Sequence, residues 1–370
     1  MTTITGGLVA LRVIVVSMKL SRCGWFAAWL LGGCHAPTSS SGVQPTVAPA
    51  VHVHGNRLVD SAGRVVHLRG VNRSGTEYAC AQGWGFFDGP SDSASVEAIA
   101  SWKVNVVRVP LNETCWLAIN GVKPAYSGDN YRKAISDYVG LLNRAGLIAI
   151  LELHWSAADT GVALAQAPMP DRDHTPEFWR EVAAAYANNR QVIFDLFNEP
   201  YPDNNSDTPE AWRCWKSGGT CSGMSYQAAG MQELVDAVRG AGATNVIMVG
   251  GVRYASTLSG WLANKPTDPR NNLAVSWHVY NFSGCHTAGC WDSTAAPVAL
   301  QVPIVLGELG QNDRGSAFVT ALMDWMDART GGAGYLAWEW DLWGDPLDLI
   351  TSYDGTPTAY GQTFKTRFSR

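Results

Sequence analysis

The sequence predicts an α/β protein built as one (β/α)8 barrel with an N-terminal β-hairpin in front of it. Eight apolar runs of strand length recur along the chain, and amphipathic helical stretches lie between them. Continuous apolar strands separated by helices indicate a parallel sheet that is covered on both faces. No strand is followed by a Gly-x-Gly-x-x-Gly turn, so a closed barrel is favoured over an open doubly wound sheet.

The hairpin comes first, because residues 51–68 alternate between apolar and polar and turn at His54-Gly55-Asn56 and again at Asp60–Gly63. The barrel strands are expected at 65–71, 104–110, 147–153, 192–197, 245–249, 273–279, 302–306 and 334–338. Helices, apolar at i, i+3 and i+4, are expected among others at Tyr131–Ala145, Pro176–Ala187, Tyr226–Gly240 and Ala317–Arg329.

Composition supports a globular chain. With 370 residues, 46% hydrophobic and 16% charged, the chain can bury a large core, which excludes a disordered or collagenous protein. Length alone would suggest two domains, but barrels often exceed about 250 residues as one unit. The formal net charge of −5 argues against nucleic acid and anionic membranes as partners. Sixteen tryptophans are more than a core requires, so we expect several at the surface.

Residues 1–34 read as a signal peptide. Met18-Lys19-Leu20-Ser21-Arg22 supplies a basic start, Trp25–Leu31 a short apolar stretch, and Leu31-Gly32-Gly33-Cys34 a small-residue cleavage site. The last four residues resemble the lipobox of bacterial lipoproteins, so Cys34 is a candidate lipid anchor and simple secretion is the alternative. The start codon is Met1 or Met18. We expect a protein outside the cytoplasm, extracellular or periplasmic.

Residues 35–50 are rich in Pro, Ser and Thr and carry no charge, which is typical of a linker. The folded part, 51–370, is then expected to begin near Val51.

Beyond the linker six cysteines remain, an even number that favours disulfides in an exported chain. Fifteen pairings of six cysteines can be drawn. Short spacing favours Cys214 with Cys221 and Cys285 with Cys290, which leaves Cys80 with Cys115. Zinc binding is the rival interpretation, but no pair has Cys-x-x-Cys spacing.

Polar residues gather at the carboxyl ends of the predicted strands, where barrel enzymes carry their chemistry. Glu199 and Glu308 end the fourth and seventh strands, on opposite walls of the barrel mouth. Cleavage of a glycosidic bond needs two carboxyl groups that flank the anomeric carbon. The other polar or aromatic residues at strand ends are Arg69, Asn72, Arg108, His154, Trp155, Asn198, His278, Tyr280 and Trp338.

These strand ends carry six motifs in order: Leu68-Arg69-Gly70-Val71-Asn72, Val106–Pro110, Leu153-His154, Asp195–Pro200, His278-Val279-Tyr280 and Gly307–Gly310. With them the chain resembles glycoside hydrolase family 5, the cellulase-type retaining enzymes, over essentially all of 51–370. Asn-Glu-Pro alone is a weak signal. The resemblance is strong because six motifs occur in order at the ends of the predicted strands. The resemblance implies a β-glycosidase that needs no cofactor and no metal.

By that resemblance Glu199 is the general acid/base and Glu308 the nucleophile that forms a covalent glycosyl-enzyme. The two carboxyl groups of a retaining pair lie about 5 to 5.5 Å apart. Arg108 and Tyr280 are expected to hydrogen-bond the nucleophile, and the guanidinium keeps it ionised. Desolvation and the charge of Glu308 are expected to raise the pKa of Glu199.

The resemblance also implies sugar contacts. Asn198 is expected to bind the 2-hydroxyl, His154 and His278 other ring hydroxyls, and Trp338 to lie under the sugar. Trp84, Trp116 and Trp155 are candidate sugar platforms, although for any one of them packing is an equally good interpretation. The same choice between packing and sugar contact holds for Trp291, Trp340 and Trp343, whereas Glu152, Asp195 and Glu339 are read as helix-facing or supporting.

The sequence offers some support for two other classes of protein. A metal-dependent hydrolase is suggested by His52-Val53-His54, but this motif precedes the first barrel strand and no later ligand set completes it. A non-catalytic sugar-binding barrel would be signalled by loss of a carboxylate, and Glu199 and Glu308 are both present. We therefore favour an enzyme.

The substrate is expected to be a polysaccharide or oligosaccharide, with endo-β-1,4-glucanase action first and a mannanase or an exo-acting or side-branch β-glycosidase as the alternatives. The loops Tyr78–Pro90, Pro200–Gly223 and Phe282–Ala295 are long and aromatic, and Leu309 replaces the usual Phe or Trp after the nucleophile. These departures weaken the case for a simple open cleft. We expect no separate carbohydrate-binding module, and a monomer.

Overall fold

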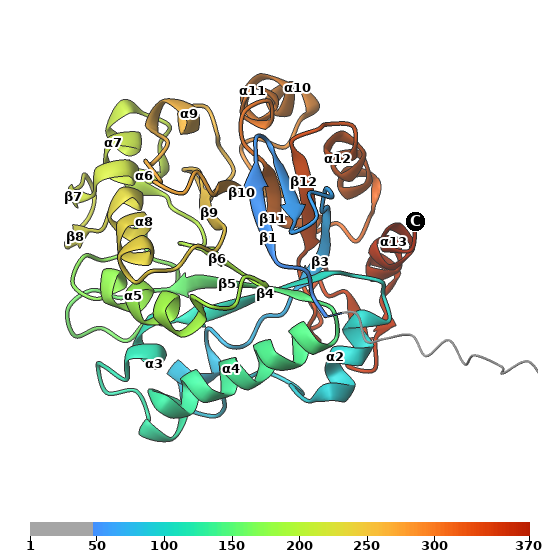
Figure 1. The fold of residues 1–370 in the computed structure, drawn as a ribbon, viewed down its shortest axis with the longest axis horizontal. Helices are drawn as coiled ribbons and strands as arrows, with labels where there is room; N and C mark the ends of the chain where they lie inside the picture. Colours follow the sequence, from blue (N-terminus) through green and yellow to red (C-terminus); the bar gives the residue numbers. More distant parts are fainter. Residues whose placement is uncertain (1–46) are drawn as a thin grey trace, which may run out of the picture. The chain divides into compact units, whose positions relative to one another are not determined.

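The computed structural model describes residues 47–370. Within them eight parallel strands close into a barrel in the order β10-β11-β12-β3-β4-β5-β6-β9, which confirms the predicted (β/α)8 fold (Figure 1). Each strand overlaps one of the eight predicted ranges. The strands are β3 Leu68–Asn72, β4 Val106–Asn112, β5 Ile148–Trp155, β6 Val192–Asp195, β9 Ile247–Gly250, β10 Leu273–Tyr280, β11 Ile304–Gly310 and β12 Gly332–Ala337.

The signal peptide and lipid-anchor predictions fall on residues outside the described part of the chain, as does most of the linker. Ala48 is already buried and donates from its amide to Asn143, so the folded part includes residues just before Val51. Among residues 47–370 we find no helix with the length and apolar character needed to cross a bilayer.

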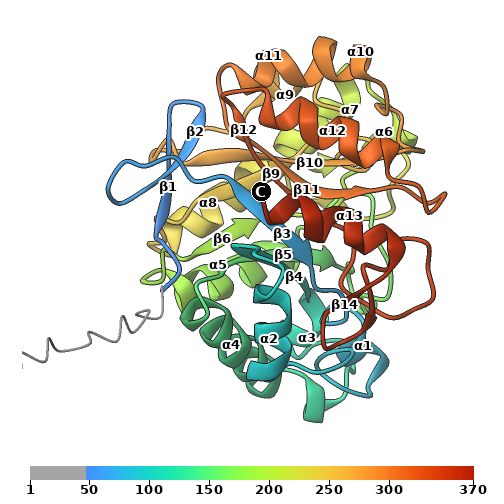
Figure 2. The same cartoon turned by 90° about the vertical axis from the view of Figure 1, so that its right-hand side faces the viewer.

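The predicted hairpin is present as β1 (Val51–His54) and β2 (Arg57–Asp60), which pair antiparallel. It lies at the end of the barrel where the strands begin: Val51 donates to the carbonyl of Arg190, just before β6, and Val53 donates to Asn272, just before β10. Val51 and Leu58 bury their side chains with the apolar residues of the barrel interior. The hairpin therefore closes the amino-terminal end of the barrel, at the left edge of Figure 2.

The helices form the outer layer around the strands (Figure 2). The longer ones are α2 Ser93–Ala100, α4 Asp129–Arg144, α5 Thr175–Tyr186, α7 Pro209–Ser217, α8 Met231–Gly240, α12 Ala317–Asp327 and α13 Ala359–Phe368. The four predicted helices correspond to α4, α5, α8 and α12. Only α8 starts clearly later than predicted, because Gly219–Thr220 (β7) and Gln227–Ala228 (β8) pair as a small hairpin.

Short elements occupy the loops. They are α1 Ala79–Gln82, α3 Glu113–Leu117, η1 Pro124–Tyr126, α6 Pro202–Asn205, α9 Trp261–Asn264, α10 Ala288–Cys290, η2 Trp291–Ala295, α11 Ala296–Ala299, β13 Ile350–Ser352 and β14 Thr356–Pro357.

The three predicted disulfides are all present. Their Cα atoms lie 6.1 Å apart in Cys80–Cys115, 5.8 Å in Cys214–Cys221 and 5.5 Å in Cys285–Cys290, within the usual range.

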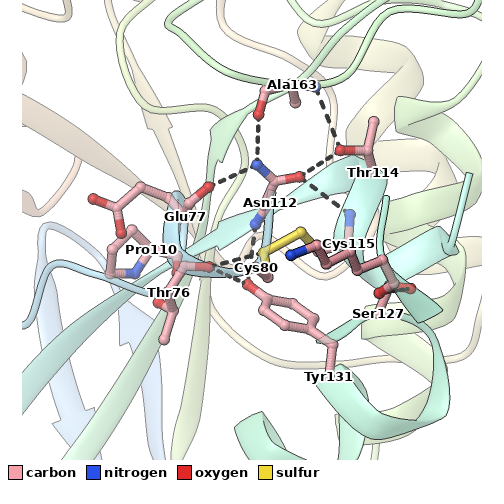
Figure 3. The surroundings of a disulfide bond; sticks show 11 residues. Thr76, Glu77, Cys80, Pro110, Asn112, Thr114, Cys115, Ser127, Tyr131 and Ala163 are labelled. Atoms are coloured by element: carbon pink, nitrogen blue, oxygen red, sulfur yellow. Dashed lines mark hydrogen bonds between the residues drawn. A yellow bond between two sulfur atoms is a disulfide. The ribbon is translucent and has the colours of Figure 1, made fainter. Parts of the chain in front are cut away.

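Cys80–Cys115 ties α1 to α3 beside a buried amide (Figure 3). Asn112, the last residue of β4, caps α3 by accepting from the amide of Cys115 at 3.1 Å. Its Nδ2 donates to the carbonyls of Glu77 and Ala163 at 2.6 and 2.8 Å. The loops that follow β3, β4 and β5 are thus fixed to one another above the barrel.

Candidate active site

The carboxyl ends of the strands surround a cleft of about 690 Å³. Both predicted acidic residues, Glu199 and Glu308, line it. The other lining residues are His154, Asn198, Asn205, Arg253, Tyr254, Ser256, Tyr280, Phe282, Ser283, Gly284, Trp338 and Leu347.

Strand periodicity explains how polar groups reach this end of the barrel. Ile148 and Ile150 of β5 belong to the apolar barrel interior. Since alternate residues of a strand share a face, Glu152 and His154 continue the same line toward the cleft. Ile193 and Asp195 of β6 repeat this arrangement. Inside the barrel, a layer of apolar side chains therefore lies beneath a layer of polar side chains that is nearer the cleft.

The two acidic residues meet across the cleft. Glu199 follows β6 and Glu308 lies in β11, and each has a carboxylate oxygen within 4.8 Å of one on the other. His278 of β10 lies next to both, with Nδ1 at 3.1 Å from Glu199 Oε1 and 3.6 Å from Glu308 Oε2. This separation fits the short spacing of the carboxyl groups in a retaining pair and not the wider spacing of an inverting pair.

Both oxygens of Glu308 are held. Arg108 Nη1 donates to Oε1 at 2.8 Å and the Tyr280 hydroxyl donates to Oε2 at 2.6 Å. Arg108 is fully buried, and it also pairs with Asp195 at 3.1 Å and Glu152 at 3.5 Å. Burial opposes the charge of Arg108, but these carboxylates outweigh it and raise the pKa of the guanidinium. A permanent cation therefore lies beside Glu308.

Glu199 differs in its environment. Burial, followed by the negative charge of Glu308, raises the pKa of Glu199 to about 8. Burial and the charge of Arg108 hold the pKa of His278 well below its usual range, so the imidazole is neutral beside it. One carboxyl group can thus carry a proton near neutral pH while the other is clamped by charged and hydroxyl donors.

Asn198 and His154 extend this network. Asn198 Oδ1 accepts from Arg108 Nη2 at 2.9 Å, and its Nδ2 donates to Gln166 Oε1 at 2.9 Å. His154 stacks on Trp338 with ring centroids 5.8 Å apart. Burial opposes protonation of His154, but the charge of Glu152 raises its pKa to about 9. The fold therefore brings the predicted site residues together at the cleft. They come from β4, β5, β6, β10, β11 and the end of β12.

The tryptophans divide into two groups. Trp84 is 48% exposed, and it lies with the half-buried Trp155 and the exposed Trp343 around Tyr78, at ring-centroid distances of 6.0, 6.4 and 5.4 Å. Trp116, in contrast, is 1% exposed, and the prediction that it is a sugar platform is wrong. Its ring packs on Tyr131 and Phe178, and its indole N–H donates to Glu181. Trp291 and Trp340 are also buried.

Glu152 and Asp195 support the site by pairing with Arg108, and they face the barrel interior rather than the helices, as the alternation with Ile148, Ile150 and Ile193 could have indicated. Sequence reasoning missed Gln166, which contacts Asn198, and the lining residues Arg253, Tyr254 and Phe282. All four come from loops after strands, where no periodic signal marks them.

Two groups of side chains could geometrically hold a metal ion. One is Glu199, His278 and Glu308. The other is Glu113, Asp171 and His174, in which both carboxylates already accept hydrogen bonds from Thr175, that to Glu113 at 2.5 Å. His52 and His54 lie in the hairpin at the opposite end of the barrel from this site.

Comparison with known proteins identifies the family. Residues 59–343 match the family model for cellulase (glycosyl hydrolase family 5). A mannan endo-1,4-β-mannosidase of Streptomyces lividans is 26% identical over 85% of this chain and 73% of its own length. A manganese-dependent endoglucanase of Phanerodontia chrysosporium is 28% identical over 61% of this chain and 56% of its own length.

Among solved structures, a β-glucanase of Saccharophagus degradans in complex with cellotetraose superposes with a TM-score of 0.67 at 22% identity, covering 90% of this chain and 98% of that one. This likeness supports the barrel fold. With the family match over most of the chain, the protein belongs to glycosyl hydrolase family 5.

Proposed function

We propose that this protein hydrolyses β-glycosidic bonds of a polysaccharide with retention of configuration, and that it acts as an endo-β-1,4-glucanase. The observation that carries the proposal is the approach of Glu199 and Glu308 to within 4.8 Å, with one carboxyl group protonated and the other clamped by Arg108 and Tyr280.

In the first step the carboxylate of Glu308 attacks the anomeric carbon, and the bond from that carbon to the leaving oxygen breaks. Glu199 gives its proton to this oxygen, so the leaving sugar departs as an alcohol. In the second step a water gives a proton to Glu199 while its oxygen attacks the same carbon, and the ester to Glu308 breaks.

The surrounding residues act on charge and position. Arg108 compensates the negative charge that returns to Glu308 in the second step. Asn198 lies between Arg108 and Gln166, where its amide can contact the sugar 2-hydroxyl. Trp338, stacked on His154, offers the sugar a flat apolar face.

A mannan backbone is the second candidate, because the mannan-cleaving relative from Streptomyces lividans matches over 85% of this chain. The experiment that separates the candidates is a panel of β-glucans, mannans and xyloglucan with sizing of the products. Short oligosaccharides released from the middle of a β-1,4-glucan are the expected result. Release of single sugars from chain ends, or cleavage of mannan alone, would contradict the endoglucanase assignment.

We further propose that the enzyme needs no metal, since the two carboxyl groups supply both nucleophile and acid. The three disulfides support a site of action outside the cytoplasm, by secretion or by lipidation at Cys34. Metabolic labelling with a palmitate analogue, compared between the natural chain and Cys34→Ser, tests the anchor.

A further inference from the structure

One side of the cleft contains a cation without a protein partner. Arg253 follows β9 and lines the cleft. Within residues 47–370 its side chain forms no ion pair, and its buried Nε has no hydrogen-bond partner. A buried polar group without a partner in a native fold calls for an occupant, because leaving it unsatisfied destabilises the folded state.

The backbone holds this arginine in a strained turn. Arg253, Tyr254 and Ala255 have φ values of 56°, 59° and 53°, a left-handed conformation that costs non-glycine residues free energy. Two long-range hydrogen bonds anchor it: Tyr254 N donates to the Pro200 carbonyl at 3.0 Å and His278 N donates to the Ala255 carbonyl at 3.2 Å. The turn is thereby tied to the residue after Glu199.

The guanidinium of Arg253 also packs closely against the loop that contains Gly284. A side chain at Gly284 would lie 3.0 Å from Arg253 Nη2, so the guanidinium lies directly over the Gly284 backbone. The disulfide Cys285–Cys290 begins at the next residue and fixes this part of the loop.

Two exposed aromatic rings flank the arginine along the cleft. Tyr254 is 41% exposed and stacks on Tyr201, with centroids 4.6 Å apart. Phe282 is 61% exposed and stacks on Tyr280 at 5.1 Å. Asn205 Oδ1, on the same lining, is buried and has no hydrogen-bond partner in the described chain. Flat apolar faces next to free polar atoms match the surface of a sugar.

In the proposed mechanism, the Arg253 side of the cleft faces the leaving group. The proton of Glu199 goes to the leaving oxygen, and the turn at 253–255 is bonded to the residue that follows Glu199. A sugar that leaves with that oxygen would then meet Arg253, Tyr254 and Phe282, which line the cleft.

We infer that the leaving-group side of the cleft binds a sugar that carries a carboxylate, a uronic acid unit, and that Arg253 determines this specificity. A guanidinium offers a planar fork of donors that matches a carboxylate, and its positive charge offsets the repulsion from Glu199 and Glu308. This inference rests on the proposed glycosidase function.

The test uses cello-oligosaccharides partly oxidised at C6 to carboxylates, and the same oligosaccharides after reduction of the carboxylates back to alcohols. Manno-oligosaccharides treated in the same way serve if the panel identifies mannan. The measured quantity is the ratio of kcat/KM on the oxidised substrate to that on the reduced one. We expect about a tenfold preference for the oxidised substrate in the natural protein, as a charged hydrogen bond can supply. The uronic acid unit should be found at the non-reducing end of the leaving fragment, because that sugar carries the leaving oxygen.

In Arg253→Met the ratio should fall to about one or below, and Arg253→Lys should keep part of the preference. Arg270→Met is the matched control, because Arg270 is exposed just before β10, at the far end of the barrel, and it should keep the natural ratio. If Arg253→Met does not fold, Arg253→Lys and a loss of preference at high ionic strength decide the matter.

The outcomes separate the two proposals. A natural protein that cleaves the reduced oligosaccharides and shows no preference for the oxidised ones overturns the inference and leaves the glycosidase function standing. A preference that persists in Arg253→Met also overturns it. A natural protein that cleaves neither form overturns the glycosidase function, and this inference with it.

Discussion

The hydroxyl of Tyr280 donates a 2.6 Å hydrogen bond to Glu308 Oε2, while Arg108 donates to the other oxygen at 2.8 Å. The proposed nucleophile is thus fixed in rotation by two donors from two different strands, β10 and β4. Its orientation toward the anomeric carbon depends on both bonds.

Tyr280→Phe should therefore lower kcat on a β-glucan about 10- to 100-fold, because a hydrogen bond to a charged group contributes about 1.5 to 3 kcal/mol. KM should change less, since the ring keeps its contact with Phe282. Steady-state kinetics measure both constants. Tyr126→Phe, which removes the hydroxyl of a residue that does not line the cleft, should match the natural protein. An unchanged kcat in Tyr280→Phe would remove this residue from the proposed mechanism.

Azide rescue tests the roles of the two carboxyl groups. Glu308→Gly should lose turnover, and added azide should produce a glycosyl azide of inverted configuration from an aryl glycoside, because azide then attacks directly. Glu199→Ala should instead produce the retained azide, since the covalent intermediate still forms. NMR of the anomeric proton distinguishes the products. The opposite pattern would exchange the two roles.

The pH dependence should report the proton on Glu199. Because its pKa is raised to about 8, the carboxyl stays protonated below that pH, and kcat/KM on natural glycan should fall as the pH rises above about 8. In Glu199→Ala, a dinitrophenyl glycoside needs no proton for its leaving group, so this alkaline fall should be absent from the first step. The same alkaline fall in Glu199→Ala would assign it to another group.

The disulfides should differ in their contribution to stability. Cys80–Cys115 closes a loop of 35 residues and Cys285–Cys290 one of 5. On the chain-entropy argument, their removal should lower the free energy of unfolding by about 4 and about 2 kcal/mol respectively. Denaturant unfolding of the two double Cys→Ser variants measures this. Equal losses would show that the loops retain structure in the unfolded chain.

Chelation should leave activity unchanged. After treatment with EDTA and removal of the chelator, the rate on β-glucan should equal that of the untreated protein, because the proposed mechanism uses Glu199 and Glu308 without a metal. Adding Mn²⁺ should have no effect. A loss that Mn²⁺ restores would place this protein with its manganese-dependent fungal relative and contradict the proposed metal independence.

The barrel and the acidic pair could be predicted because both have strong signals in the sequence. Apolar runs of strand length mark the strands, and Glu199 and Glu308 occur at the ends of two of them. The disulfides could be predicted because two of the three pairs are adjacent in sequence, which leaves a single choice for Cys80 and Cys115.

Other features have no such signal. Trp116 resembles a surface platform in sequence, but its position in α3 turns it toward α4 and α5 and buries it. Arg253 and Tyr254 owe their direction to a left-handed turn without glycine, which hydrogen bonds to Pro200 and His278 anchor to distant parts of the chain. Contacts between distant loops decide such positions, and periodicity does not report them.

The hairpin β1–β2 occupies the end of the barrel opposite the cleft, and this has a consequence for an enzyme attached through its amino terminus. The chain enters the barrel through Ala48 at the closed end, whereas Glu199 and Glu308 open toward the other end. If the enzyme is attached upstream of Ala48, by a lipid or by an engineered support, the cleft lies on the side away from the attachment point and is accessible to insoluble fibres. Immobilisation through the amino terminus should accordingly preserve access to bulky substrates better than immobilisation through the loops around the cleft.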